Sequence, residues 1–205
     1  MRNIVNDTQF LSERATMMYY FQDEFYNPEK TEIFYSPSGK FKLEIHHYNH
    51  VEGIIRYNYT KGIITDSEHK TIDIIYRNFG TFLFSWLEIN GIEYLLGGLD
   101  YQGYSIVNLS NKQTKHYVPE EAYKGHGFCW GEIIYFQQKK LIVIDGCYWA
   151  CPYELVFYDF SNPMNMPYNE LFRVEVDSIT NWDNWKDYCR VRYLDGENNE
   201  KEFVF

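Results

Sequence analysis

The sequence predicts an all-β protein that is built from antiparallel four-stranded meanders and begins with a short helix. Aromatic residues make up 20% of the 205-residue chain, with 20 Tyr and 15 Phe, and alanine is scarce. Branched and aromatic side chains pack well on a pleated surface, so this composition favours strands. One strand-like segment also occurs twice, as Phe84-Ser85-Trp86-Leu87-Glu88-Ile89 and as Phe128-Cys129-Trp130-Gly131-Glu132-Ile133. The duplication predicts a repeated β-architecture with Trp86 and Trp130 in the core.

A second pair of similar segments follows the first pair. The segment Ile106-Val107-Asn108-Leu109-Ser110-Asn111 is echoed by Phe157-Tyr158-Asp159-Phe160-Ser161-Asn162. A period of about 40 to 50 residues is typical of four-stranded propeller blades. The second echo has the longer spacing, which predicts an insertion in the later copy, mostly within residues 146–152.

The first strands can be predicted from turn chemistry. Apolar residues at roughly helical spacing after Asp7 predict a short helix within residues 7–25. A strand at 31–35 is followed by the turn Ser36-Pro37-Ser38-Gly39-Lys40 and a strand at 41–45. Pro fixes one backbone angle and Gly permits a positive one, so this segment predicts a hairpin. It resembles the Ser-Pro-Asp-Gly-Lys turn of propeller repeats, with Ser38 where Asp is usual.

The rest of the chain reads as further strands and short turns, with Asn90-Gly91 as the strongest hairpin signal. We expect one domain over residues 1–205, made of units at 27–78, 80–119 and 126–177 and a C-terminal hairpin or partial unit at 178–205. The last segment should contain strands at 188–193 and 202–205. The fold class is therefore a small or partial β-propeller. The alternative is a β-sandwich or barrel, because the sequence predicts local pairing better than closure.

Charge and cysteine content limit the partners and the compartment. The formal net charge of −10 argues against nucleic-acid binding, and no apolar run is long enough for a signal peptide or a membrane span. Four cysteines, unevenly spaced, do not suggest a secreted disulfide framework. We expect a cytoplasmic protein with reduced thiols and no contact with membranes.

Loops between the second and third strands of propeller blades emerge on one face, where their residues can converge. Such connections are expected at 46–53, 100–103 and 145–152. Tyr and Trp in loops supply large, rigid contact area and are enriched at binding hot spots. The sequence therefore predicts binding residues, with an aromatic and acidic character, at Asp100, Tyr101, Tyr104, Asp145, Tyr148, Trp149 and Tyr153.

Catalytic and metal sites are less well supported. Zinc-ligand types occur at His46, His47, His50, Asp100, Asp145, Cys147 and Cys151. Cys147 and Cys151 lack the Cys-x-x-Cys spacing, so we predict no metal and no cofactor. Asp100 and Asp145 at matching positions would suit glycoside cleavage, although such Asp residues more often fix turns. A thiol nucleophile with His50 or His126 has no spacing that supports it.

The sequence thus favours a non-enzymatic module that binds a protein or peptide through the aromatic, acidic loop face. An intracellular inhibitor or immunity-type protein would fit the acidity. The alternative is a hydrolase, with or without a metal, that uses Asp, His and Cys side chains on the same face. Open sheet edges would also allow a homodimer.

Overall fold

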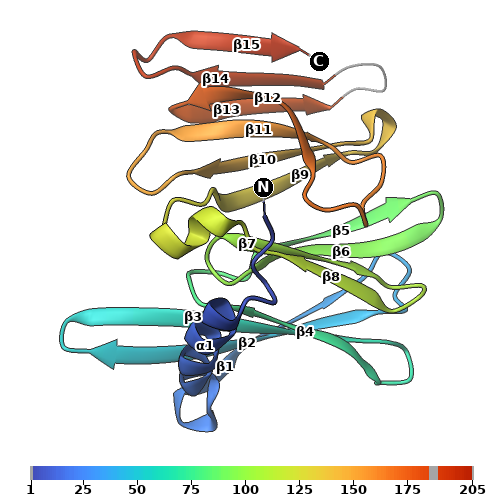
Figure 1. Cartoon of the computed structure of the whole chain (residues 1–205). Helices are drawn as coiled ribbons and strands as arrows, with labels where there is room; N and C mark the ends of the chain where they lie inside the picture. The colour runs from blue at the N-terminus through green and yellow to red at the C-terminus, as the bar shows by residue number, and fades with distance from the viewer. Residues whose placement is uncertain (1, 185–188, 205) are drawn as a thin grey trace. The chain divides into compact units, whose positions relative to one another are not determined.

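The computed structural model describes residues 2–184 and 189–204, which form two compact units, Met1–Gly125 and His126–Phe205. Four antiparallel sheets carry the fold (Figure 1), and strands follow chain order in every sheet. Within the described residues no sheet closes into a barrel. The predicted all-β meander architecture is therefore confirmed. Tyr188, the first residue of one predicted strand, lies outside the described residues.

The first sheet of unit 1 contains β1 (Tyr26–Tyr35), β2 (Lys42–Glu52), β3 (Ile55–Thr65) and β4 (Thr71–Arg77). Its first turn forms at Ser36-Pro37-Ser38-Gly39-Lys40 as predicted, and Gly39 adopts the positive φ (72°) that the turn needs. The predicted loop at 46–53 is wrong. β2 continues through Glu52 and pairs with β3 as far as Ile55, so the three histidines lie within a long hairpin (Figure 1).

The second sheet of unit 1 contains β5 (Phe84–Ile89), β6 (Ile92–Leu99), β7 (Gly103–Asn108) and β8 (Gln113–Tyr117), followed by the 3-10 helix η3 (Glu120–Lys124). The Asn90-Gly91 turn joins β5 to β6, and both residues have positive φ. This is the geometry that the dipeptide predicts, because two-residue hairpin turns of this hand require it.

The N-terminal segment forms α1 (Thr8–Met17), then the 3-10 helices η1 (Met18–Phe21) and η2 (Asp23–Phe25). The predicted helix is confirmed and begins directly after Asp7. Asp7 occupies the N-cap position without a capping hydrogen bond. Its carboxylate instead pairs with Arg2 and accepts a hydrogen bond from the Tyr123 hydroxyl at 3.4 Å.

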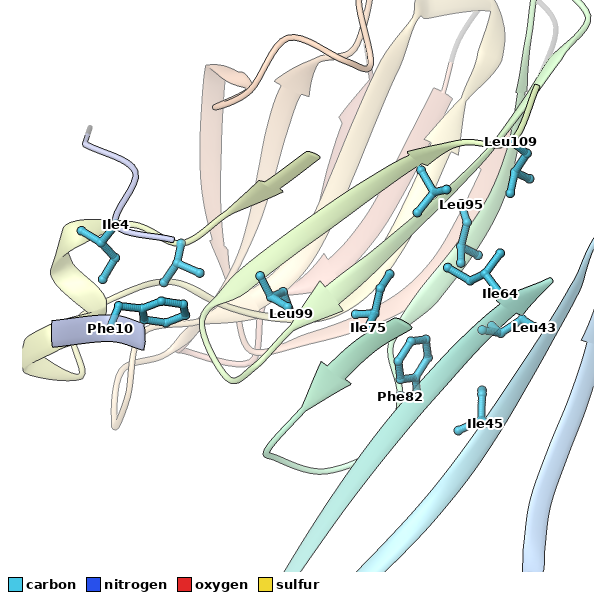
Figure 2. Close-up of a cluster of buried hydrophobic side chains, with 12 residues drawn as sticks. Ile4, Phe10, Leu43, Ile45, Ile64, Ile75, Phe82, Leu95, Leu99 and Leu109 are labelled. Atoms are coloured by element: carbon cyan, nitrogen blue, oxygen red, sulfur yellow. The ribbon is translucent and has the colours of Figure 1, made fainter. Parts of the chain in front are cut away.

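The core of unit 1 lies between its two sheets and reaches the N-terminal segment (Figure 2). Leu43, Ile64 and Ile75 from the first sheet meet Leu95 and Leu99 from the second, and none of the five is accessible to solvent. A smaller aromatic cluster joins η1 to β2 and β3, where Phe21, Tyr48 and Tyr59 are buried. Burial of these apolar faces holds the meanders together.

Unit 2 contains a four-stranded and a three-stranded sheet. The first consists of β9 (Cys129–Phe136), β10 (Leu141–Cys147), β11 (Tyr153–Asp159) and β12 (Asn169–Val176), with the 3-10 helix η4 (Gln137–Lys139) between β9 and β10. The second consists of β13 (Ser178–Asn184), β14 (Cys189–Leu194) and β15 (Glu200–Val204). Their common core includes Val143, Leu155 and Val191, and Phe157 stacks on Phe172 with 4.1 Å between ring centroids.

The two tryptophans of the duplicated segment are packed as expected, but not at equivalent positions. Trp130 is 5% exposed, and Trp86 is partly buried against the core of unit 1. The sheets can be aligned on the first residues of the second pair of similar segments, Ile106 and Phe157. Across the strands, Ile106 pairs with Leu96, which pairs with Ser85, and Phe157 pairs with Val143, which pairs with Ile134. In this structural alignment Ile134 corresponds to Ser85. In the duplicated sequence segment, by contrast, Cys129 aligns with Ser85.

The same alignment of paired residues shows where the insertion lies. Leu99 pairs with Gly103, and three residues separate them in the chain. The corresponding pair in the other sheet is Gly146 with Glu154, and seven residues separate them. The predicted position of the insertion is correct. Asp145 corresponds to Gly98 in this register, so the expectation that Asp100 and Asp145 match is wrong.

The second echo reflects a recurring turn. Side-chain oxygens of Asp66, Asn108, Asp159 and Asp195 each accept a hydrogen bond from the backbone N–H two residues later, at 2.9 to 3.1 Å. Each residue ends or follows a strand that leads into the last strand of its sheet. Asn and Asp suit this position because their short side chains bond the nearby backbone.

Candidate functional site

The predicted binding residues divide between the two units. Asp100, Tyr101 and Tyr104 belong to unit 1, and Asp145, Tyr148, Trp149 and Tyr153 belong to unit 2. Their convergence on one face stays a prediction. Within each unit, however, two of the predicted residues line the same pocket: Asp100 with Tyr101, and Asp145 with Tyr153.

Asp100 occupies the turn between β6 and β7 with a positive φ of 49° and is only 7% exposed. Its N–H donates to the Tyr76 carbonyl at 2.8 Å, and its own carbonyl accepts from Arg77 Nη1 at 3.3 Å. Arg14 Nη1 on α1 lies 3.5 Å from its Oδ2. The turn is therefore fixed from three directions.

The hydrogen bonds and charges around the Asp100 carboxyl do not offset the cost of burying it. Burial raises the pKa of Asp100 to about 6, although Arg14 and Arg77 act to lower it. Among the described protein groups, no donor reaches its Oδ1. Buried polar atoms normally have a partner, so this oxygen marks a candidate ligand contact.

Tyr101 and Tyr104 have different surroundings. Tyr101 is half-buried and packs on Phe79, with 4.4 Å between ring centroids. Tyr104 lies in β7 and not in the loop, is 6% exposed and packs on Tyr117. Tyr104 directly follows the expected connection at 100–103, and β7 begins at Gly103, where a Cβ would lie 2.8 Å from two backbone oxygens.

Asp145 lies within β10 and not in the predicted loop. It pairs with Glu132 on β9 and with Leu155 on β11, so its side chain lies on the same face as the core residue Leu155. Burial, and then repulsion from Glu132, raises the pKa of Asp145 to about 6. Within the described residues its buried Oδ1 has no hydrogen-bond partner.

Asp145 lines a pocket of about 220 Å³ that we call the acidic pocket. Its walls are Asp145, Tyr153, Val176, Asp177, Ser178 and Ile179. Asp177, at the junction of β12 and β13, brings a second carboxylate, and its N–H donates to the Leu194 carbonyl at 2.7 Å. The pocket therefore combines two acids, a hydroxyl and an exposed aromatic ring.

Residues 148–152 connect β10 to β11 and belong to the inserted segment; we call them the aromatic loop. The loop begins at Tyr148, which lies beside Arg173. Arg173 Nη1 donates to the Tyr148 hydroxyl at 3.2 Å and to Glu154 at 2.6 Å, and its Nε and Nη2 donate to Glu170. Its guanidinium also lies 5.6 Å from the centroid of the Tyr148 ring. The next residue, Trp149, is 66% exposed, so one end of the loop is anchored and an indole is presented.

The thiols are positioned without the features of a reactive centre. Cys129 and Cys147 pair across β9 and β10, Cys151 is exposed, and all three are free thiols. Burial, followed by repulsion from its neighbours, raises the pKa of Cys147, which favours the protonated thiol. The side chain of Cys189 lies outside the described set.

The histidines are engaged elsewhere. His46 Nε2 lies 2.6 Å from Glu44, His47 Nε2 lies 2.7 Å from Glu32, and the His50 ring lies 4.9 Å from that of Tyr20. In residues 2–184 and 189–204, no three His, Cys, Asp or Glu side chains are grouped to share a metal ion. The hypothesis of a His and Cys metal loop gains no geometric support.

Sequence reasoning missed Asn78, Arg14, Asp177 and Arg173. None lies within the expected loops. Asn78 and Asp177 share a pocket with residues distant in the chain, and Arg14 and Arg173 contact such residues directly. Their residue types alone do not indicate a site, because polar residues are common at strand ends. Only the packing of separate segments assigns them to these sites.

Comparisons with known proteins support the fold and leave the activity open. No protein-family model matches the chain. It is 32% identical over 145 residues to an uncharacterized protein of Acanthamoeba polyphaga mimivirus, covering 70% of this chain and 56% of the viral protein. The chain thus spans little more than half the length of this relative. No helix in the described part of the chain is long and apolar enough to cross a membrane.

The solved structure of the dihydro-heme d1 dehydrogenase NirN in complex with DHE is similar to this chain. The TM-score is 0.50 at 12% identity, covering 85% of this chain and 38% of that chain. At this identity the likeness concerns the fold alone. Together with the successive antiparallel meanders, it identifies the architecture as propeller-type.

Proposed function

We propose that this chain is a non-enzymatic binding module that captures a basic side chain of a protein or peptide partner. The acidic pocket of unit 2 would receive the cationic group, and the aromatic loop would contact the neighbouring residues. A partner of this chemistry would suit an inhibitor or immunity-type protein.

The observation that carries the proposal is the buried Oδ1 of Asp145, which no donor among the described residues satisfies. Asp177 lines the same pocket, and Glu132 faces Asp145 across the strand pair. A Lys ammonium or an Arg guanidinium would supply donors and positive charge to this group of acids. Within the described lining no basic side chain already does so.

Exposed aromatic rings beside the pocket add contact area. Tyr153 lines the pocket and is half exposed, and Trp149 is exposed on the adjoining loop. Rings of this kind stack on peptide groups and on cations, and they are enriched at binding hot spots. The net charge of −10 would also attract a basic partner over long range.

Titration with short blocked peptides tests the proposal. Ac-Gly-Gly-Lys-Gly-Gly-NH2 and its Arg counterpart should shift the NMR signals of Asp145, Tyr153 and Asp177, whereas a norleucine peptide should not. Asp145→Asn should weaken Lys or Arg binding about tenfold or more, since a charged hydrogen bond is lost. Glu200→Gln, an exposed charge change in the same unit, is the matched control.

Equal binding of the norleucine peptide, or an unchanged affinity in Asp145→Asn, would contradict the proposal. If Asp145→Asn does not fold, Asp177→Asn provides the same comparison at the pocket rim. Reduced binding to both basic peptides, with unchanged circular dichroism, is the supporting result.

A hydrolase is the second candidate, and one observation favours it. A carboxyl with a raised pKa beside a second carboxylate is an arrangement found in general-acid sites. Nitrophenyl glycosides would test it: turnover by the purified chain that Asp145→Asn abolishes would support the enzyme. Absence of turnover together with binding of basic peptides would favour the module.

A further inference from the structure

Unit 1 contains a second pocket whose chemistry differs from that of the acidic pocket. It has a volume of about 160 Å³ and is enclosed by the N-terminal segment, α1, the turn that holds Asp100 and the segment around η3. A protein cavity of about 150 Å³ accommodates a molecule the size of benzene. The pocket is therefore suited to a ligand of roughly six to ten non-hydrogen atoms.

Two residues that line this pocket each carry an acceptor oxygen with no donor among the described protein groups. The oxygens are Oδ1 of Asp100 and Oδ1 of Asn78, and both atoms are buried. The side chain of Asp100 is 10% exposed and that of Asn78 is partly buried, and both residues line the pocket. A primary ammonium carries three donors and could satisfy the two oxygens together.

A cationic donor group lines the same pocket. The Arg14 guanidinium approaches Asp100 Oδ2 only at 3.5 Å, the outer limit of a hydrogen bond, and its centre lies 5.6 Å from the Tyr76 ring. Within the described part of the chain, most of its five N–H donors thus remain available to an acceptor. A carboxylate is the acceptor that the planar guanidinium fork fits best.

The charges around the pocket balance. Glu13 and Asp100 in the lining are acidic and Arg14 is basic, and Arg77, which is not part of the lining, donates to the Asp100 carbonyl at 3.3 Å and brings a second positive charge. Such a pocket suits a ligand with both charges and no net charge. Part of the remaining wall is apolar, with Ile4, Phe10, Met17 and Val118, which suits a short aliphatic group. Tyr101, Gln102 and Tyr123 also line the pocket.

We propose that this pocket binds a small free α-amino acid with an aliphatic side chain, in its zwitterionic form. The ammonium would donate to Asp100 and Asn78, the carboxylate would accept from Arg14, and the side chain would contact the apolar wall. This site is independent of the acidic pocket of unit 2.

Calorimetric titration of the full chain with four probes tests each group. Valine should bind with a Kd on the order of 0.1 to 1 mM, as expected for about eight non-hydrogen atoms. Valinamide and N-acetylvaline, which lack the carboxylate and the ammonium respectively, should bind about tenfold more weakly. Isobutylamine lacks the carboxylate and should resemble valinamide. Valinamide binding as tightly as valine would instead identify a peptide N-terminus as the ligand and overturn the free amino acid.

Two variants separate a binding role from a structural one. Arg14→Gln should weaken valine about tenfold and leave isobutylamine unchanged, a difference that general loss of structure would not produce. Asp100→Asn should weaken both ligands, and Glu121→Gln, an exposed charge change in the same unit, should weaken neither. No heat with valine at 10 mM, or equal loss for both ligands in Arg14→Gln, would overturn the proposal.

Discussion

Asp145 on β10 lies directly opposite Glu132 on β9, so two carboxylates occupy one face of the same sheet. Like charges at paired positions repel, and Asp145 is also partly withdrawn from water. The pair is therefore held in place by the surrounding strands at an electrostatic cost. Such costs are often found at binding and catalytic positions.

Removal of the Glu132 charge should reveal its electrostatic interaction with Asp145. Glu132→Gln is expected to lower the pKa of Asp145 from about 6, while leaving it above the ordinary value because burial is the larger cause. Carboxyl carbon NMR across pH 3 to 8 measures it. Glu175→Gln, an exposed position on β12, should leave the pKa unchanged. A pKa that stays at about 6 in Glu132→Gln would show that the two carboxylates do not interact.

Asp100 should make unfolding pH-dependent. Its pKa is about 6 in the folded chain and near 3.8 when unfolded, so the folded chain binds more protons between these values. Stability should therefore fall as pH rises from about 4 to about 6 and stay reduced above that. The cost at pH 7 is at most about 3 kcal/mol, at 1.36 kcal/mol for each pKa unit.

Asp100→Asn removes that cost and keeps a side chain that tolerates positive φ. We expect a higher free energy of unfolding in urea at pH 7 and a smaller difference between pH 4.5 and pH 7. Glu121→Gln should retain the difference seen in the unaltered chain. A destabilised Asp100→Asn would show that its ion pairs outweigh its burial, and an intact pH difference would show that other groups cause it.

The turn after β3 depends on Asp66. Its Oδ1 accepts from the N–H groups of Glu68 and Lys70, both at 2.9 Å, and its Oδ2 from Lys112 Nζ at 2.6 Å. Asp66→Ala should lower the free energy of unfolding by about 1–2 kcal/mol, because two backbone donors lose their acceptor. Asp66→Asn keeps Oδ1 and should lose about half of that or less. Equal losses in urea denaturation would assign the effect to the Lys112 pair.

Arg173 should control the order of the aromatic loop. Arg173→Lys cannot bond Glu170, Glu154 and Tyr148 together, since a lysine lacks the planar fork. Amide exchange at Cys151, whose N–H donates to the Tyr148 carbonyl at 3.0 Å, should accelerate about tenfold. Global stability should change by less than about 1 kcal/mol, because the network is largely exposed. Arg192→Lys, at another exposed ion pair, should not affect Cys151.

Gly62 leaves room for the Phe82 ring. A Cβ at Gly62 would lie 2.3 Å from the Phe82 Cζ atom, so Gly62→Ala should destabilise unit 1 by about 1–3 kcal/mol through overpacking. Phe82→Leu alone should also cost stability, because Phe82 is buried. The double variant should recover part of the Gly62→Ala loss. Additive losses in thermal or urea unfolding would show that the two positions do not share space.

Local chemistry was enough to predict most elements of this fold. The turn at residues 36–40 and the Asn90-Gly91 turn form where their glycines allow positive φ, and strands follow the aromatic and branched segments. The position of the insertion at 146–152 also follows from the two echoes. These features depend on neighbouring residues, so they can be inferred without a tertiary structure.

Register and site composition were decided only by tertiary packing. Trp86 and Trp130 look equivalent in sequence but pair with Leu95 and Gly146, in different rows of their sheets. Asp145 lies in a strand because β10 continues to Cys147, and Asp177, which lines the same pocket, comes from another connection. Asp100 meets Asn78 and Arg14 only when a turn, a strand end and a helix pack together. Local residue patterns specify which segments form strands and turns, whereas the burial of sheet faces selects which polar side chains share a pocket.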